Sequence, residues 1–456
     1  MSVWLPTVSL HSLVVVLSVL AYILTTRAQR ERRPPSIAIA WVLGMIALPY
    51  LVLPMYLMFG RRKLPRKTSA RSGVRSFAGH WAQDLIESFG LPGPSPAAIN
   101  LHRDGRDSAD ALFSVMSSAV SRLDICTYIL GDDAFGHEAM QRMMERARCG
   151  VDVRLLLDGV GAIQLPRVCF KTLQLGGVET AIFSPLFARR TQGPRNLRNH
   201  RKMVIADGAR LWAGGRNLAA EYFCGVAGAP AWRDLTFDLQ GPVAGAAAAQ
   251  FEMDWVAAGG KPASTEVAAV AGTASQSAAS EAQFLPSGPD QSEDTVHALL
   301  IDGCFQARDR MLAVTPYFVP DVSLETAMRL AARRGVRVDL VIPASSNHRL
   351  ADFARNRALR SLSQAGVNIH LMPYMSHAKA VVFDHSLALS GSVNLDSRSL
   401  LLNYECAVVF YGRAEINWLA QWIDAQIPET VPFNGRPPGL LRDLCEGLLL
   451  TVAYQL

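Results

Sequence analysis

The chain has 456 residues, half of them hydrophobic, and a mean hydropathy of +0.16. This length exceeds one ordinary core and predicts two globular units plus an additional segment, and the hydropathy is high for a wholly soluble enzyme. The formal charge of +6 suits work beside anionic lipid or nucleic acid without choosing between them, while seven scattered cysteines and ten histidines show no metal-ligand spacing, so we expect no metal and no cofactor.

Two uncharged apolar stretches, residues 8–26 and 37–60, open the chain. The first is about as long as a helix that crosses roughly 30 Å of hydrocarbon. A cleaved signal peptide is the disfavoured alternative, because the basic amino-terminal region and a small-residue cleavage site are absent. Pro49 and Pro54 should kink the second stretch. We therefore expect a transmembrane hairpin over residues 1–60.

The membrane side of the remaining chain follows from its basic residues. The turn at 27–35 holds four arginines, whereas residues 61–75 hold seven lysines and arginines. Because the larger number favours the cytoplasm, we expect the rest of the chain there, with the opposite orientation left open. Residues 61–99 are interpreted as a basic juxtamembrane linker.

Helical and strand-like stretches alternate over residues 100–260. They are a helix at 109–120, a strand at 123–130, a helix ending at Arg148 and a strand at 151–157. This alternation predicts an α/β lobe with a parallel or mixed sheet. Asp158 follows the last strand, where it either faces a ligand or holds a turn; the turn is the favoured interpretation.

A segment rich in Ala and Ser, residues 261–284, predicts a linker between two lobes. The second lobe, residues 285–456, repeats the first. Its expected elements are helices at 292–309, 324–334 and 350–365 and strands at 311–314 and 336–342. The tail then places apolar residues at helical spacing, and we expect them to pack on the second lobe in preference to lying on lipid. These residues are Leu440, Leu441, Leu444, Leu448 and Val452.

One short constellation occurs in both lobes, since His377 lies 177 residues after His200. Each copy has a histidine, a lysine two residues later, an aspartate, a pair of small residues and an asparagine. The first copy is His200, Lys202, Asp207, Gly214, Gly215 and Asn217, and the second is His377, Lys379, Asp384, Gly391, Ser392 and Asn394.

These residue types suit the binding and attack of a phosphoryl group. Apolar runs at 203–206 and 380–383 predict buried strands, so the His and Lys just before each run leave the chain on one face and can reach one phosphate. The lysine supplies positive charge, the asparagine a neutral donor, and Gly215 and Ser392 let the backbone approach the phosphate. One neutral histidine can become a phosphohistidine while the other protonates the leaving oxygen, so one site needs both copies.

Four carboxylates accompany the two copies. Asp234 and Glu405 each precede or open an apolar strand, and each could bind the far ring nitrogen of a catalytic histidine and set its tautomer; a surface or strand-edge carboxylate is the alternative. Asp207 and Asp384 belong to the catalytic motif, but each ends a strand at a turn. A structural role for them is at least as strong an interpretation as catalysis.

The two H-x-K-x4-D copies, with G-G-x-N and G-S-x-N behind them, resemble the phospholipase D superfamily. Three further features are similar to bacterial cardiolipin synthases: the sequence TPYFVPD at 315–321, the sequences NLDSRS at 394–399 and NYE at 403–405, and the apolar hairpin. Asn347 departs from this family, much of which has an acid there. That departure leaves open whether the contacts that support the site, or the substrate preference, are those of the family.

The resemblance implies two duplicated phospholipase D-like α-β-α lobes that share one active site. It further implies a multi-pass protein of the bacterial inner membrane that transfers a phosphatidyl group from one phosphatidylglycerol to another and releases glycerol, with His200 as nucleophile. The partners would be phosphatidylglycerol and anionic lipid and not nucleic acid, with homo-oligomerisation left open. The alternatives are a lipid hydrolase or a transferase with another acceptor, then a nuclease, then a non-catalytic scaffold; the membrane hairpin favours a lipid substrate.

Overall fold

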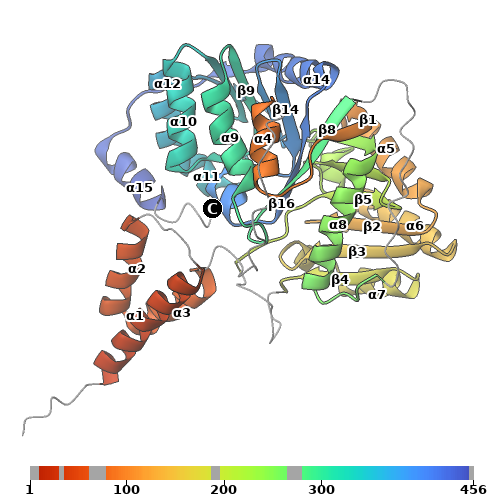
Figure 1. Ribbon diagram of the computed structural model, residues 1–456, viewed down its shortest axis with the longest axis horizontal. Coiled ribbons are helices and arrows are strands. Elements are labelled where there is room, and N and C mark those ends of the chain that lie inside the picture. Colours follow the sequence, from red (N-terminus) through yellow and green to blue (C-terminus); the bar gives the residue numbers. More distant parts are fainter. Residues whose placement is uncertain (1–9, 30–34, 61–78, 186–195, 264–279, 451–456) are drawn as a thin grey trace, which may run out of the picture.

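The computed structural model describes residues 10–29, 35–60, 79–185, 196–263 and 280–450. It consists of two α/β lobes and a separate amino-terminal group of helices (Figure 1). Most of the predicted linker at 261–284, residues 61–78 of the predicted basic segment, the turn between the first two helices and Val452 lie outside the described residues.

Lobe 1 contains seven strands and four helices in the described part of the chain. They are β1 (Ser95–His102), α5 (Gly105–Ser118), β2 (Arg122–Thr127), α6 (Ala134–Arg148), β3 (Asp152–Asp158), α7 (Arg167–Leu175), β4 (Glu179–Phe183), β5 (Met203–Ala206), β6 (Arg210–Gly214), β7 (Thr236–Gln240) and α8 (Pro242–Ala257). The predicted alternation of helix and strand is confirmed, and the strand predicted at 203–206 coincides with β5.

Lobe 2 repeats this order with short additions. Its elements are β8 (Ser280–Ser287), α9 (Thr295–Gln306), β9 (Arg310–Val314), β10 (Phe318–Val319), α10 (Val322–Arg333), β11 (Arg337–Pro343), α11 (Arg349–Ala354), α12 (Asn356–Ala365), β12 (Asn368–Met372), β13 (Ala380–Phe383), β14 (Leu387–Gly391), β15 (Leu395–Asp396), α13 (Ser397–Leu401), β16 (Glu405–Phe410), α14 (Arg413–Asp424), β17 (Val431–Pro432) and α15 (Leu440–Leu450). The helix predicted at 350–365 is two helices, α11 and α12, divided at Arg355.

One sheet runs through both lobes. Within the described residues its order is β17-β12-β11-β9-β13-β14-β16-β8-β1-β7-β6-β5-β2-β3-β4. The two lobes meet where β1 pairs with β8, with Ser95 opposite Ala282. From this pair toward each edge of the sheet, the equivalent strands of the two lobes follow in the same order. The rings of Phe237 on β7 and Phe410 on β16 lie 5.3 Å apart across the join. The predicted duplicated α/β fold is therefore confirmed, and the two lobes share a core.

The two motif strands lie inside the lobes. Every residue of β5 and of β13 is buried, because helices cover both faces of the sheet (Figure 1). Strands buried on both faces read as continuous apolar runs, which is the pattern of Met203–Ala206 and Ala380–Phe383. The residues just before these two strands lie where lobe 1 and lobe 2 meet, as the bridges between Asn199 and Tyr404 and between Arg233 and Ser376 show.

A helix that precedes lobe 1 packs on lobe 2. We expected residues 61–99 to be a linker, but α4 (Trp81–Ser88) occupies part of this range. Its Ala82 and Ile86 are fully buried in the core of lobe 2, and the His80 ring caps the helix by accepting a hydrogen bond from the Ala82 amide. The alternation of apolar and polar residues at helical spacing in this short segment was the missed signal.

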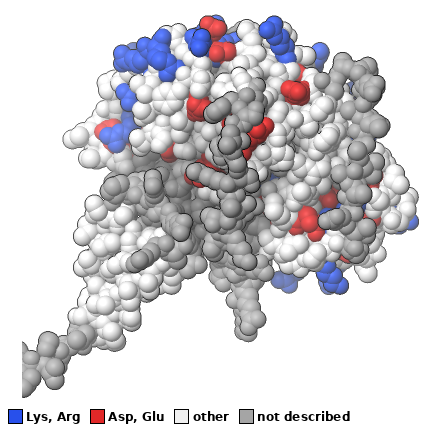
Figure 2. Space-filling view, viewed as in Figure 1, with Lys and Arg blue, Asp and Glu red and all other residues white. Residues whose placement is uncertain are grey.

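The amino-terminal helices are α1 (Leu10–Gln29), α2 (Pro35–Ala47) and α3 (Pro49–Phe59). The single helix predicted at 37–60 is therefore divided at Leu48, next to Pro49, whereas Pro54 remains inside α3. Tyr22, Met45 and Tyr56 form a small buried cluster, while the visible face of the hairpin carries no charged side chain (Figure 2). In the part of the chain described here, no helix meets the length and apolarity needed to cross a bilayer.

The carboxy-terminal helix α15 contacts α11 and α12. Its buried Glu446 accepts hydrogen bonds from Arg360 at 2.5 Å and from Arg442 at 3.0 Å. By contrast, Leu440 and Leu441 are about four-fifths exposed. The prediction that the leucine stripe packs on lobe 2 is wrong for these residues, because the helix is held by ion pairs on its other face.

Candidate active site

Each motif histidine is held at the junction by the backbone of the opposite lobe. The His200 amide donates to the Tyr404 carbonyl at 2.8 Å, and the His377 amide donates to the Arg233 carbonyl at 2.6 Å. Short parallel bridges, one of them between Asn199 and Tyr404, extend these contacts. The structure therefore brings the two copies of the motif together at one place.

Each imidazole is bound by a carboxylate from the other lobe. His200 Nδ1 lies 3.0 and 3.1 Å from the two carboxylate oxygens of Glu405, which begins β16 in lobe 2. His377 Nδ1 lies 2.8 Å from Asp234, which precedes β7 in lobe 1. A carboxylate that accepts the Nδ1 proton leaves the Nε2 lone pair available to a substrate. The acids are thus exchanged between the lobes.

The two lysines lie beside the histidines and are nearly fully buried. Lys202 Nζ donates to the His200 carbonyl at 2.8 Å, and Lys379 Nζ donates to the His377 carbonyl and lies 3.2 Å from His377 Nε2. Burial lowers the pKa of Lys202 to about 8 and that of Lys379 to about 7, although Glu405 and Asp234 oppose the effect. A bound anion would restore both charges.

Burial also keeps the imidazoles neutral. It is the main cause that lowers the pKa of His200, with Lys202 and Lys379 adding to the effect, and burial followed by Lys379 lowers the pKa of His377 to about 3. Since Lys379 acts on His200 across the lobe boundary, the two half-sites lie within electrostatic reach of one another. Both rings are therefore uncharged in the ligand-free protein, which is the form in which an imidazole can act as a nucleophile.

The two carboxylates remain ionised. Burial raises the pKa of Asp234, but the charge of Lys379 and the contact with His377 outweigh this, and the net pKa is below its ordinary value. Burial also raises the pKa of Glu405, but the contacts with His200 and Lys202 have the larger effect, and its net pKa is below the ordinary value. Each acid can therefore stabilise an imidazolium that forms during a reaction.

The small residues predicted to approach phosphate serve the carboxylates. The Ser392 hydroxyl donates to Glu405 at 2.5 Å, and the Ser399 hydroxyl donates to the same carboxylate at 2.6 Å. At the equivalent place in lobe 1, a Cβ added to Gly215 would lie 2.1 Å from an Asp234 oxygen. Gly215 thus makes room for its acid and Ser392 binds its acid, while the prediction that these two residues also approach phosphate stays a prediction.

The two motif asparagines differ. Asn217 accepts from the Ile129 amide at 3.3 Å and donates to the Tyr222 hydroxyl at 2.8 Å, so its side chain supports the protein. Asn394 has a buried side-chain oxygen with no hydrogen-bond partner, which leaves this amide the better placed of the two to meet a ligand. Its predicted role in binding phosphate remains a proposal.

The motif aspartates lie away from the imidazoles. Asp207 ends β5 and its carboxylate accepts hydrogen bonds from the amides of Val120, Ser121 and Arg122, at 2.8 Å each. Asp384 does the same at the end of β13, where it binds the amides at 308–310 at 2.7 to 3.0 Å. The strand separates each aspartate from its histidine, so these contacts favour the structural interpretation of the two aspartates over a catalytic one.

Aromatic side chains that the sequence reasoning did not assign surround the histidines. Tyr128 packs edge-on against His200 with ring centroids 5.2 Å apart, and Tyr222 and Trp232 lie 5.1 and 5.8 Å from His377. Tyr317 lies 6.3 Å from His377 and donates to Asn347 at 2.5 Å. The TPYFVPD motif could have pointed to Tyr317, whereas the other three carried no local signal.

Arg201 lies beneath the site and was also missed. It is fully buried, donates to Asp254 at 2.5 Å and to Asp290 at 3.0 Å, and donates to the Glu405 carbonyl at 2.9 Å. The second copy has the apolar Ala378 here. Asp158 accepts hydrogen bonds from the Val160 and Asn199 amides and so supports the turn before His200, as the favoured interpretation predicted.

Comparison with known proteins identifies relatives over most of the chain. Residues 112–255 and 300–427 match the family described as "Cardiolipin synthase, PLD-like domain", and residues 14–61 match "Phospholipase_D-nuclease N-terminal". Cardiolipin synthase A of Pseudomonas aeruginosa is 29% identical over 94% of this chain and 92% of its own length. Cardiolipin synthase A of Pseudomonas putida is 30% identical over 82% and 83%, and the major cardiolipin synthase of Bacillus subtilis is 29% identical over 84% and 85%.

A solved structure shares the fold. The phosphatidylserine synthase of Haemophilus influenzae superposes with a TM-score of 0.61 over 82% of this chain and 99% of its own, at 13% sequence identity. At this identity the likeness concerns the fold alone. It agrees with the duplicated α/β lobes.

Proposed function

The chain belongs to the cardiolipin synthases with a PLD-like domain, and on that premise we propose that it transfers a phosphatidyl group between two phosphatidylglycerol molecules and releases glycerol. The observation that carries the proposal is the exchanged pair of His–carboxylate contacts, His200 with Glu405 and His377 with Asp234. One site then holds two oriented imidazoles and two lysines, which is what a two-step phosphoryl transfer requires.

In the first step, His200 Nε2 attacks the phosphorus of the donor lipid. The bond between phosphorus and the glycerol headgroup oxygen breaks, and the departing oxygen takes a proton from His377. Glycerol leaves, and the phosphatidyl group remains on His200 as a phosphohistidine. The positive charges of Lys202 and Lys379 match the negative charge of the phosphate oxygens, and the neutral Asn394 side chain donates a hydrogen bond to them from Nδ2.

In the second step, a hydroxyl of the second phosphatidylglycerol attacks the same phosphorus. His377 takes the hydroxyl proton, the P–N bond to His200 breaks, and cardiolipin forms with both histidines back in their starting states. His377 must be protonated before the first step, although it is neutral in the free protein. The negative charge of the bound diester and the carboxylate of Asp234 both favour the imidazolium, so donor binding supplies the condition for protonation.

The test is to incubate the purified protein in liposomes with labelled phosphatidylglycerol and to resolve the products, with His200→Ala and His377→Ala alongside. We expect cardiolipin and free glycerol in equal amounts, and a loss of nearly all turnover in either variant. Phosphatidic acid as the sole lipid product would replace the proposal with a hydrolase. Substantial activity in both variants would contradict the two-histidine scheme.

We also propose that the amino-terminal helices lie in the membrane and that the lobes face the cytoplasm. Support comes from apolar side chains that α1 and α3 leave exposed, including Leu17, Ile23 and Leu51, which are about half exposed. Burying such surface in hydrocarbon is favourable at roughly 25 cal/mol per Å². A chain lacking residues 1–60 should move from the membrane fraction to the supernatant. In intact spheroplasts an impermeant thiol reagent should not label the exposed Cys149, and labelling would reverse the orientation.

A further inference from the structure

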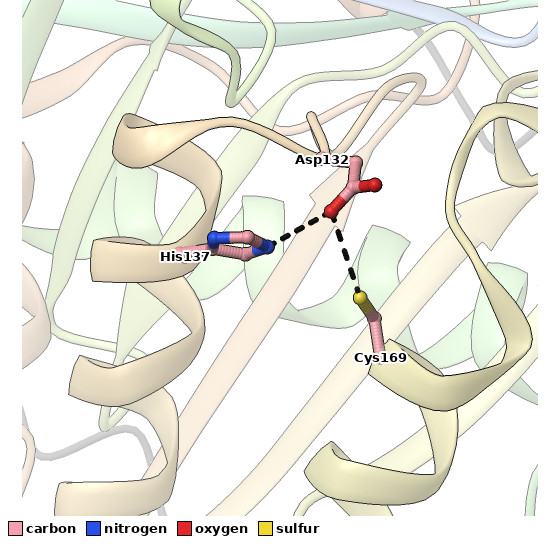
Figure 3. A group of neighbouring side chains, drawn as sticks. All are labelled: Asp132, His137 and Cys169. Carbon is pink, nitrogen blue, oxygen red and sulfur yellow. Dashed lines mark hydrogen bonds and ion pairs between the residues drawn. The ribbon is translucent and has the colours of Figure 1, made fainter.

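Three side chains of lobe 1 meet at a place separate from the two histidines. Asp132 lies in the loop after β2, His137 in the first turn of α6 and Cys169 in the first turn of α7 (Figure 3). One carboxylate oxygen, one imidazole nitrogen and one thiol sulfur lie within 4.8 Å of one another. Asp132 Oδ1 is central, 2.9 Å from His137 Nε2 and 3.9 Å from Cys169 Sγ.

These separations suit three ligands of one small cation. Tetrahedral zinc, bound to oxygen and nitrogen at about 2.1 Å and to sulfur at about 2.3 Å, places its ligand atoms roughly 3.4 to 3.6 Å apart. The two observed separations, 2.9 and 3.9 Å, lie on either side of this range, so binding requires small adjustments, for which the exposed Asp132 and His137 side chains have room. The Asp132 and His137 side chains are 45% and 53% exposed, whereas Cys169 is only 9% exposed.

The donor set selects the class of ion. Magnesium and calcium require a shell of six or more oxygens, and only one carboxylate contributes here. A thiolate, an imidazole and a carboxylate together are a borderline set that zinc and its neighbours in the first transition series prefer. We propose that Asp132, His137 and Cys169 bind one divalent ion of this class, with a fourth position open to water.

The ion would tie together three segments that otherwise meet through hydrogen bonds. The loop that carries Asp132 begins at Tyr128, which packs on His200, and its Gly131 amide donates to the Leu218 carbonyl at 2.8 Å, next to the motif residue Asn217. Holding this loop against α6 and α7 stabilises lobe 1 from outside the reaction centre. The site is therefore structural, and it neither requires nor tests the proposed transfer reaction.

The experiment uses the full-length chain in detergent, purified without a polyhistidine tag and stripped with a chelator. Zinc is added at increasing concentration and the thermal unfolding midpoint is recorded, because an ion that binds only the folded state raises it. We expect a rise of several degrees with saturating zinc. Cobalt in place of zinc should produce a thiolate-to-metal charge-transfer band at one ion per chain.

Matched variants locate the ion. Cys169→Ser and His137→Asn should each weaken zinc binding by at least roughly tenfold, while their metal-free midpoints stay near that of the parent. Cys149→Ser and His385→Asn change exposed residues of the same types elsewhere and should keep the full response. If Cys169→Ser does not fold, the half-exposed His137 decides the outcome. No midpoint shift and no charge-transfer band in the parent, or an unchanged response in His137→Asn, would overturn the proposal.

Discussion

The two imidazoles have matching sequence motifs but different surroundings. The His377 side chain is 4% exposed and is surrounded by Tyr222 and Trp232, whereas the His200 side chain is 13% exposed. The same His-x-Lys spacing therefore produces unequal electrostatics, with the pKa of His377 lowered to about 3 and that of Lys379 to about 7. The loss of charge from the lysines with rising pH is the consequence that an experiment can measure most directly.

At the scale of one residue, activity should decline in alkaline solution. A lysine is charged below its pKa, so as the pH rises through about 7 and then about 8, Lys379 and Lys202 of the free enzyme lose their charges and bind the anionic donor less well. Loss of one charged hydrogen bond costs about 1.5 to 3 kcal/mol, or roughly a tenfold to hundredfold decrease in kcat/KM. The measurement is kcat/KM against pH in mixed micelles.

Lys379→Arg isolates this effect, because arginine keeps its charge throughout the range. Its profile should lose the first part of the alkaline decline even where the absolute rate is lower. Lys171→Arg, on the surface helix α7, is the control and should leave the profile unchanged. Identical alkaline limbs in Lys379→Arg and the parent would show that Lys379 does not titrate there.

At the scale of one element, each motif is a strand with different functions at its two ends. The His and Lys precede β5 or β13, while Asp207 and Asp384 follow it with φ angles of 52° and 49°. Each aspartate then binds three amides at the start of the neighbouring strand, β2 or β9. The aspartate recurs because it fixes the pairing of two central strands, and this positions the histidine at the other end.

Changing Asp384 should therefore affect stability more than chemistry. Asp384→Ala removes a carboxylate that accepts hydrogen bonds from three amides, and alanine tolerates the positive φ at this position less well than aspartate does. We therefore expect the free energy of unfolding to fall by about 2 to 3 kcal/mol. Asp384→Asn tolerates that backbone and keeps one acceptor oxygen, so it should lose about half as much. Denaturant unfolding measures both, and kcat per folded molecule should stay within about threefold of the parent. A hundredfold lower kcat at unchanged stability would return the aspartate to the reaction.

At the scale of the whole molecule, neither lobe contains a complete half-site. The acid for His200 lies on β16 of lobe 2, and the acid for His377 lies at the start of β7 in lobe 1. Arg201 joins the same junction to Asp254 and Asp290 in a network that is nearly closed to solvent. If the proposed two-histidine reaction is correct, the junction of the lobes is part of the active site as well as a contact between two domains.

A substitution in lobe 2 should consequently impair the histidine of lobe 1. Glu405→Gln keeps the size of the side chain but removes the charge that stabilises a phosphorylated or protonated His200, so formation of phosphohistidine should slow by about 10² to 10⁴. Rapid quenching of the reaction with labelled donor lipid measures this rate. Asp238→Asn changes another His–Asp pair, with His102, and serves as a control that should keep the parent rate. Equal rates for Glu405→Gln and the parent would exclude the exchanged acid from the reaction.

The sequence by itself determined the duplicated α/β lobes, the family and the paired histidines and lysines. These follow from short-range patterns: apolar runs of strand length, helix and strand in alternation, and a motif whose spacing recurs after 177 residues. The family match and the observed fold confirm the lobes and the family. The division of the helix at 37–60 lies at Pro49, where a kink was expected, whereas helix α4 was missed although its short sequence carries apolar residues at helical spacing.

Only the tertiary structure decided which carboxylate serves which histidine. His200 and Glu405 are 205 residues apart and His377 and Asp234 are 143 apart, so no local spacing encodes either pair. The contact of Cys169 with Asp132, 37 residues away, also depends on the packing of separate segments. Such contacts form where segments distant in the sequence pack against one another. Their geometry depends on the packing of the whole sheet, so local sequence patterns do not predict it.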